Sequence, residues 1–72
     1  MEKGRITQVI GPVIDVELPS GKLPMIKGAL TVTVDGKQRI MEVAQHMGNR
    51  TVRCIMLASS EGLSKNTEVT AT

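Results

Sequence analysis

The sequence predicts an all-β domain that closes into a small six-stranded barrel, and three observations support this. Val, Ile and Thr make up 21 of the 72 residues, and side chains branched at Cβ fit a pleated strand better than a helix. Apolar and polar residues alternate in several short segments. These segments recur roughly every ten residues between turn residues, which is typical of a sandwich or barrel. A chain this short has little else to cover sheet edges, which favours closure.

The first half of the chain predicts three strands. Residues 4–10 and 13–18 are separated by Gly11-Pro12, because proline cannot donate a hydrogen bond to a strand ladder. The second of these segments alternates strictly, which is the pattern of a strand with one buried face. Residues 19–28 hold two of the three prolines and predict a long loop, after which residues 30–34 alternate again.

The second half predicts three more strands. Asp35-Gly36 supplies a two-residue hairpin turn, because both central positions of that turn need a positive φ. A fourth strand is expected at residues 38–46, followed by a turn at Gly48-Asn49. A fifth strand is expected at residues 50–57. Residues 59–66 then predict a loop and residues 67–71 a sixth strand.

The alternation also predicts which side chains face the barrel interior. The expected inward-facing residues are Ile14, Val16, Leu18, Leu30, Val32, Val34, Val43, Val52, Cys54 and Met56. Because the chain has no Phe, Tyr or Trp, methionines are expected to fill the remaining core, namely Met41, Met47 and Met56. The intervening polar residues are expected on the outer face, and these are Asp15, Glu17, Thr31 and Thr33.

The fifth strand is apolar on both faces near one end. Ile55 and Leu57 alternate with the expected core residues Cys54 and Met56. A lone barrel buries only one face of each strand, so Ile55 and Leu57 are candidates for a subunit interface. A chain of this length also forms a marginal core, which a partner surface would support.

The composition excludes several kinds of binding site. The net charge is +2 with acids and bases interspersed, and no aromatic side chain is available to stack on the bases of a single strand. Neither Gly21-Lys22 nor Gly36-Lys37 has the spacing of a phosphate-binding P-loop. No apolar run approaches the ~20 residues of a transmembrane helix, and the first residues lack the apolar region of a signal peptide. A single cysteine fits a reducing compartment.

Four residues suggest chemistry, but each has a simpler role. Cys54 and His46 are the only residues of their types, so they fall short of the four ligands that structural zinc prefers. Cys54 could be a nucleophile with His46 as base, yet a small core hydrophobe and a strand-end residue bonded to backbone or water fit better. Asp15 and Glu17 resemble a catalytic pair, but they alternate with apolar residues, which favours a solvated outer face.

Several segments of the chain resemble one family. Residues 4–16, Gly-Arg-Ile-Thr-Gln-Val-Ile-Gly-Pro-Val-Ile-Asp-Val, are similar to the opening of the beta subunit of F-type rotary ATP synthases. Residues 23–30 are similar to the next loop of that family, and Val52-Arg53 and residues 61–63 continue the match. The most specific stretch is residues 42–48, Glu-Val-Ala-Gln-His-Met-Gly, which resembles the beta subunit's Glu-Val-Ala-Gln-His-Leu-Gly and is unlike the alpha subunit.

The resemblance covers nearly the whole chain, although single residues differ from the usual pattern of the family. Gly28-Ala29-Leu30 stands where the family typically has Asn-Ala-Leu. Lys65-Asn66 stands where the family usually has a basic residue and a glycine near a turn. Because Asn tolerates a positive φ better than other non-glycine residues, the turn at Asn66 is expected to be kept.

The resemblance implies an assembly role. Residues 1–72 would be the N-terminal barrel of a bacterial-type beta subunit, cut from a longer chain whose nucleotide-binding and C-terminal domains are absent here. In that family the barrel packs beside alpha-subunit barrels on both sides in a closed alternating ring, the crown. No catalytic residue of the family falls within residues 1–72, which implies no enzyme activity and no cofactor for this segment.

The resemblance also places the parent protein. ATP, ADP and Mg²⁺ would bind elsewhere in the full subunit, which belongs to a proton-translocating ATP synthase. The expected location is the cytoplasmic face of a bacterial cell membrane, as a soluble peripheral part that makes no direct membrane insertion and binds no nucleic acid. Two other hypotheses are a stand-alone small barrel that binds single-stranded nucleic acid and a free-standing enzyme.

Overall fold

The computed structural model describes residues 3–19, 21, 23–34, 36–57, 62–65 and 67–71. Every regular element among them is a strand. The strands are β1 (Lys3–Ile10), β2 (Val13–Glu17), β3 (Ala29–Val34), β4 (Lys37–Gly48), β5 (Thr51–Met56) and β6 (Glu68–Ala71). The described residues therefore hold no helix that could cross a membrane.

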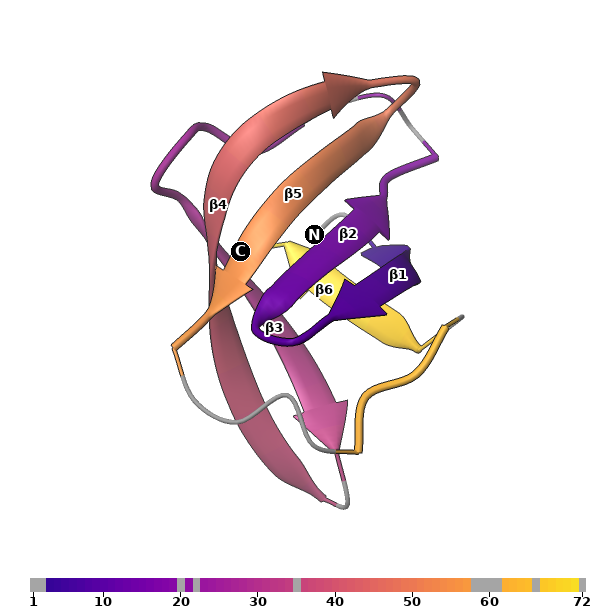
Figure 1. Ribbon diagram of the computed structural model, residues 1–72, viewed down its shortest axis with the longest axis vertical. Coiled ribbons are helices and arrows are strands. Elements are labelled where there is room, and N and C mark those ends of the chain that lie inside the picture. The colour runs from indigo at the N-terminus through magenta and orange to yellow at the C-terminus, as the bar shows by residue number, and fades with distance from the viewer. Residues whose placement is uncertain are drawn as a thin grey trace.

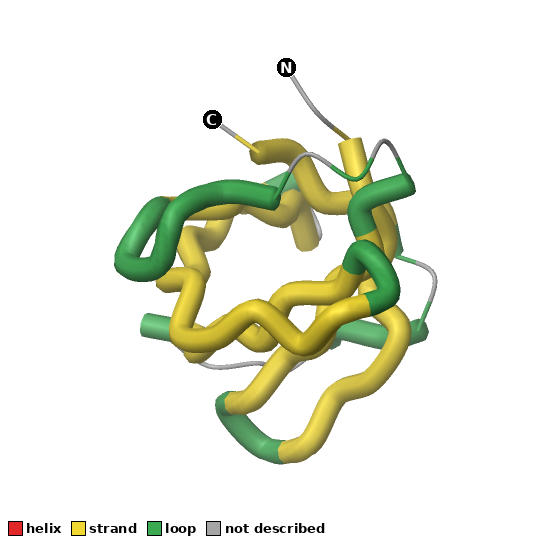
Figure 2. Tube along the Cα trace, turned by 90° about the horizontal axis from the view of Figure 1, so that it is seen from above, coloured by secondary structure: helices red, strands yellow, loops and turns green. Residues whose placement is uncertain are grey.

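The six strands form one closed antiparallel barrel, as the sequence predicted. Their order around the barrel is β1-β2-β5-β4-β3-β6. Figure 1 shows β4, β5 and β2 side by side, and Figure 2 shows the strands surrounding the interior. The last strand closes the barrel because it pairs with both β1 and β3, through Lys3↔Thr70 and Leu30↔Ala71.

The turn between β4 and β5 lies one residue later than predicted. Gly48 pairs with Thr51, so Asn49 and Arg50 are the two central residues of the hairpin. Their φ angles are 50° and 62°, as this type of turn requires. Two hydrogen bonds hold Arg50 in this unfavourable conformation: its backbone carbonyl accepts from the Leu18 amide (2.7 Å), and its side-chain Nη1 donates to the Pro19 carbonyl (2.9 Å).

The other predicted turns are partly described. Gly36 has a φ of 76°, as the hairpin between β3 and β4 requires, whereas Asp35 lies outside the described residues. Asn66 and part of the predicted loop at residues 59–66 also lie outside them.

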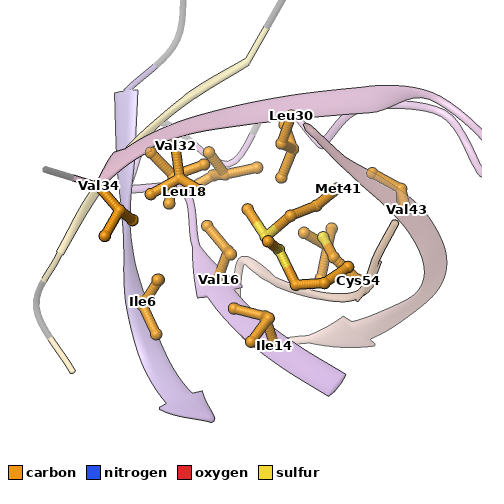
Figure 3. Packing of buried hydrophobic residues seen from close by; sticks show 13 residues of the cluster. Ile6, Ile14, Val16, Leu18, Leu30, Val32, Val34, Met41, Val43 and Cys54 are labelled. Carbon is orange, nitrogen blue, oxygen red and sulfur yellow. The ribbon is translucent and has the colours of Figure 1, made fainter. Parts of the chain in front are cut away.

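The core confirms the alternation pattern. All ten residues predicted to face inward are buried, and so is Met41. Ile6 of β1 and Val69 of β6 complete the cluster, and Val9, Leu23 and Leu63 pack against it. Figure 3 shows side chains from β1, β2, β3 and β4 converging with Cys54 of β5 in the barrel interior. The interior is thus filled without aromatic side chains.

Met47 is the core residue that the sequence predicted wrongly, since its side chain is 40% exposed. The register of β4 against β5 shifts between Val43 and Gln45, and again between His46 and Gly48. Each shift leaves one extra residue on β4, which reverses the faces of the residues that follow. The period of two that holds at Met41 and Val43 is therefore lost before Met47.

Gly4 lies where β1 approaches β2 too closely for a side chain. A Cβ at this position would lie 2.4 Å from the Glu17 carbonyl oxygen and 2.7 Å from Leu18 Cδ2. We expect Gly4→Ala to lower the free energy of unfolding by about 1.5 kcal/mol, because a backbone atom must move. Urea unfolding measures this, with Gln8→Ala, an exposed site on the same strand, as the control. If the two variants have the same urea midpoint of unfolding, β1 can move away from β2 without a loss of stability.

Candidate subunit interface

The outer face of the barrel carries an apolar row that crosses three strands. Ile10 pairs with Val13, and Val13 pairs with Ile55. Directly paired residues share one face of a sheet, and the neighbouring pair Ile14 and Cys54 points into the core. The row therefore faces outward, with Ile10 56% and Ile55 37% exposed.

Two further residues extend this row on β4 and at the end of β5. The Leu57 amide donates to the Ile40 carbonyl (3.4 Å), which places the two residues side by side. Leu57 is 67% and Ile40 50% exposed. We define the outer apolar patch as the residues Ile10, Val13, Ile40, Ile55 and Leu57. An apolar patch that is continuous across four strands is typical of an interaction surface.

The sequence identified only part of this patch. It predicted Ile55 and Leu57 as interface candidates, and both lie within the patch. It missed Ile10, Val13 and Ile40, because each lies on a different strand and only the pairing register brings them beside Ile55. The signal available in the sequence was the apolar pair Ile10 and Val13 on both sides of the Gly11-Pro12 turn.

A partly buried ion pair lies beside the outer apolar patch. Arg53 donates from Nε to Asp15 Oδ1 (2.9 Å) and from Nη2 to Asp15 Oδ2 (3.1 Å). The prediction of a solvated Asp15 is wrong, because its outward-facing carboxylate is covered and only 7% of the residue is exposed. The hydrogen bond from Arg53 and the negative charge of Asp15 raise the pKa of Arg53, so the guanidinium stays charged.

Glu17 takes part in a separate ion pair. Its Oε1 accepts from Nε (3.1 Å) and lies 3.0 Å from Nη2 of Arg5. Each of the two carboxylates on β2 is thus bound by its own arginine. Asp15 and Glu17 therefore form two separate cross-strand ion pairs, which fix the register of β2. This arrangement differs from the acid and base of a catalytic pair.

His46 and Cys54 do not meet as a base and a nucleophile. The His46 side chain bonds to the Pro24 carbonyl through Nε2 (2.6 Å), in agreement with the simpler role that the sequence favoured. Cys54 is fully buried, and burial, with a smaller contribution from the Asp15 charge, raises the pKa of its thiol to about 12. The described residues contain no group of three or more His, Cys, Asp or Glu that could hold a metal ion.

The raised pKa of Cys54 predicts how stability depends on alkaline pH. An ordinary thiol ionises near pH 9.0, whereas the native thiol keeps its proton to about pH 12. The unfolded state therefore binds fewer protons in this interval, so the free energy of unfolding should fall as the pH rises from 9 toward 12. Urea titrations at several pH values measure the slope, and Cys54→Ala should flatten it. If Cys54→Ala shows the same dependence of stability on pH as the unmodified chain, other groups cause the loss of stability at alkaline pH.

A comparison with protein families agrees with the barrel fold. Residues 6–72 match the family described as the ATP synthase alpha/beta family, beta-barrel domain. The matched residues include all of β2 to β6 and most of β1. They therefore also include every residue of the outer apolar patch.

Proposed function

Because the chain belongs to the ATP synthase alpha/beta family as its beta-barrel domain, we propose that it is the barrel of a bacterial beta subunit and serves ring assembly. The assignment to the beta subunit rests on residues 42–48, Glu-Val-Ala-Gln-His-Met-Gly, which resemble that subunit and not alpha. The observation that carries the assembly role is the outer apolar patch, whose residues Ile10, Ile40 and Leu57 are each at least half exposed.

The proposed partners are alpha-subunit barrels on both sides of this barrel. In a closed ring of alternating subunits the contacts are heterologous, so each barrel uses two different surfaces. We assign the outer apolar patch, including Ile55 and Leu57, to one of these two contacts. Removing this patch from water would contribute roughly 25 cal/mol for each Å² of apolar area that is buried.

The barrel domain of this family has no catalytic site of its own. ATP, ADP and Mg²⁺ therefore bind, in our proposal, to the nucleotide-binding domain of the parent subunit, and the complete proton-translocating enzyme synthesises or hydrolyses ATP. The barrel would act at the cytoplasmic face of the cell membrane as a peripheral part of that complex.

Size-exclusion chromatography with light scattering tests this proposal. The chain is mixed with purified alpha subunit, and Mg-ATP and a single-stranded oligonucleotide are titrated into the chain alone. We expect the chain to form a complex with alpha. We expect no saturable binding of Mg-ATP or of the oligonucleotide. The assembly role would be overturned if the chain does not bind alpha, or if it binds the oligonucleotide tightly in a salt-dependent manner.

A further inference from the structure

One carboxylate stands directly beside the outer apolar patch. Glu42 of β4 pairs with Ile55 on one side and with Ala29 on the other. It is exposed and shares the outward face of β4 with Ile40, two residues earlier. A partner that covers Ile40 and Ile55 must therefore also cover Glu42 or approach it closely.

Glu42 differs from the other carboxylates that the structure describes. Asp15, Glu17 and Glu68 each form an ion pair with a basic residue on a neighbouring strand. The cross-strand neighbours of Glu42 are apolar, and among the described residues no ion pair or side-chain hydrogen bond involves it. Among the carboxylates that the structure describes, Glu42 is thus the one whose charge no ion pair compensates, and it lies at the edge of the outer apolar patch.

The energetics of burial then constrain the partner. Covering a carboxylate with an apolar surface is unfavourable unless a cation or hydrogen-bond donors replace its water. From this we infer that the outer apolar patch binds a surface that is itself apolar but carries one Lys or Arg side chain opposite Glu42. The inference rests on the proposed function, in which the occupant is the neighbouring barrel of the ring.

The same charge disfavours a contact between two copies of this chain. Two barrels packed patch to patch would bring two Glu42 carboxylates into one small interface, and like charges in such a contact oppose association. Glu42 would therefore select a partner of complementary charge, while the surrounding apolar residues supply most of the contact area. We expect the isolated chain to remain monomeric at neutral pH.

Calorimetric titrations with purified alpha subunit at low and high salt test the inference. Glu42→Gln should weaken binding about tenfold at low salt, the size expected for losing one interfacial ion pair. It should also reduce the salt dependence, and Glu42→Lys should weaken binding further. Glu68→Gln is the matched control, because it removes an exposed carboxylate whose partner is Lys3 of the same chain, and it should bind as the unmodified chain does.

The outcomes separate the inference from the proposed function. Thermal melts of both Glu42 variants should match the unmodified chain, since Glu42 is exposed and forms no described ion pair. If the unmodified chain does not bind alpha, the proposed function fails and the inference fails with it. If the unmodified chain binds and Glu42→Gln binds equally well with the same salt dependence, only the inference is overturned.

Discussion

Replacing Arg53 by methionine should lower the melting temperature of the barrel by roughly 15 °C, a large shift for a domain of this size. In the unmodified barrel only 7% of Asp15 is exposed, and the substitution removes both hydrogen bonds that its carboxylate accepts from Arg53. An unpaired buried carboxylate is far less favourable than a paired one. The substitution should also weaken the pairing of β2 with β5, because Asp15 and Arg53 are directly opposite each other in these two strands.

A double variant separates the lost pair from the lost packing. Asp15→Val combined with Arg53→Met replaces both charged partners by apolar side chains, a change that is often nearly neutral. It should therefore recover most of the stability that Arg53→Met alone loses. Circular dichroism melts of the unmodified chain, both single variants and the double variant complete the cycle. If the double variant is as unstable as Arg53→Met, packing of the arginine stem contributes more to the stability of the barrel than the ion pair does.

Leu57→Asp should strongly weaken binding to the alpha subunit while leaving the barrel folded. Leu57 is 67% exposed in the isolated chain, so a carboxylate there remains in water and should change the melting temperature little. In the proposed contact it would be buried unpaired, which costs several kcal/mol. We therefore expect binding to alpha to weaken at least about 100-fold.

Paired measurements on the same preparation test this prediction. A melting curve reports the fold, and size-exclusion chromatography with alpha reports assembly. Thr33→Asp is the control, because Thr33 is exposed on β3 and lies outside the outer apolar patch. If Leu57→Asp unfolds the chain while the surviving protein assembles normally, Leu57 belongs to the core and the interface assignment is wrong.

The sequence predicted the barrel and most of its core for a simple physical reason. In strands without bulges, period-two alternation fixes which face each side chain occupies, and Ile14, Val16 and Leu18 on one segment followed it. The prediction failed for Met47 because β4 gains two extra residues against β5. No local composition marks those positions, since they depend on how the two strands fit together.

The exposure of outward-facing residues was harder to predict. Asp15 does face outward, but its burial depends on Arg53, which is distant in sequence and adjacent only through the β2–β5 register. The same register brings Ile10 beside Val13 and Ile55. Alternation within one strand predicts faces, whereas a surface patch depends on pairings between strands that the sequence does not specify residue by residue.

Methyl NMR of the isoleucine side chains in the presence of alpha subunit tests the assembly role most directly. Ile6 and Ile14 are fully buried in the barrel core and serve as internal references. We predict that the methyl signals of Ile10, Ile40 and Ile55 shift or broaden on addition of alpha while those of the two core residues change little. If all of these signals stay unchanged, or if Ile26 in the loop before β3 is the only isoleucine that responds, the outer apolar patch is not the surface that holds the ring together.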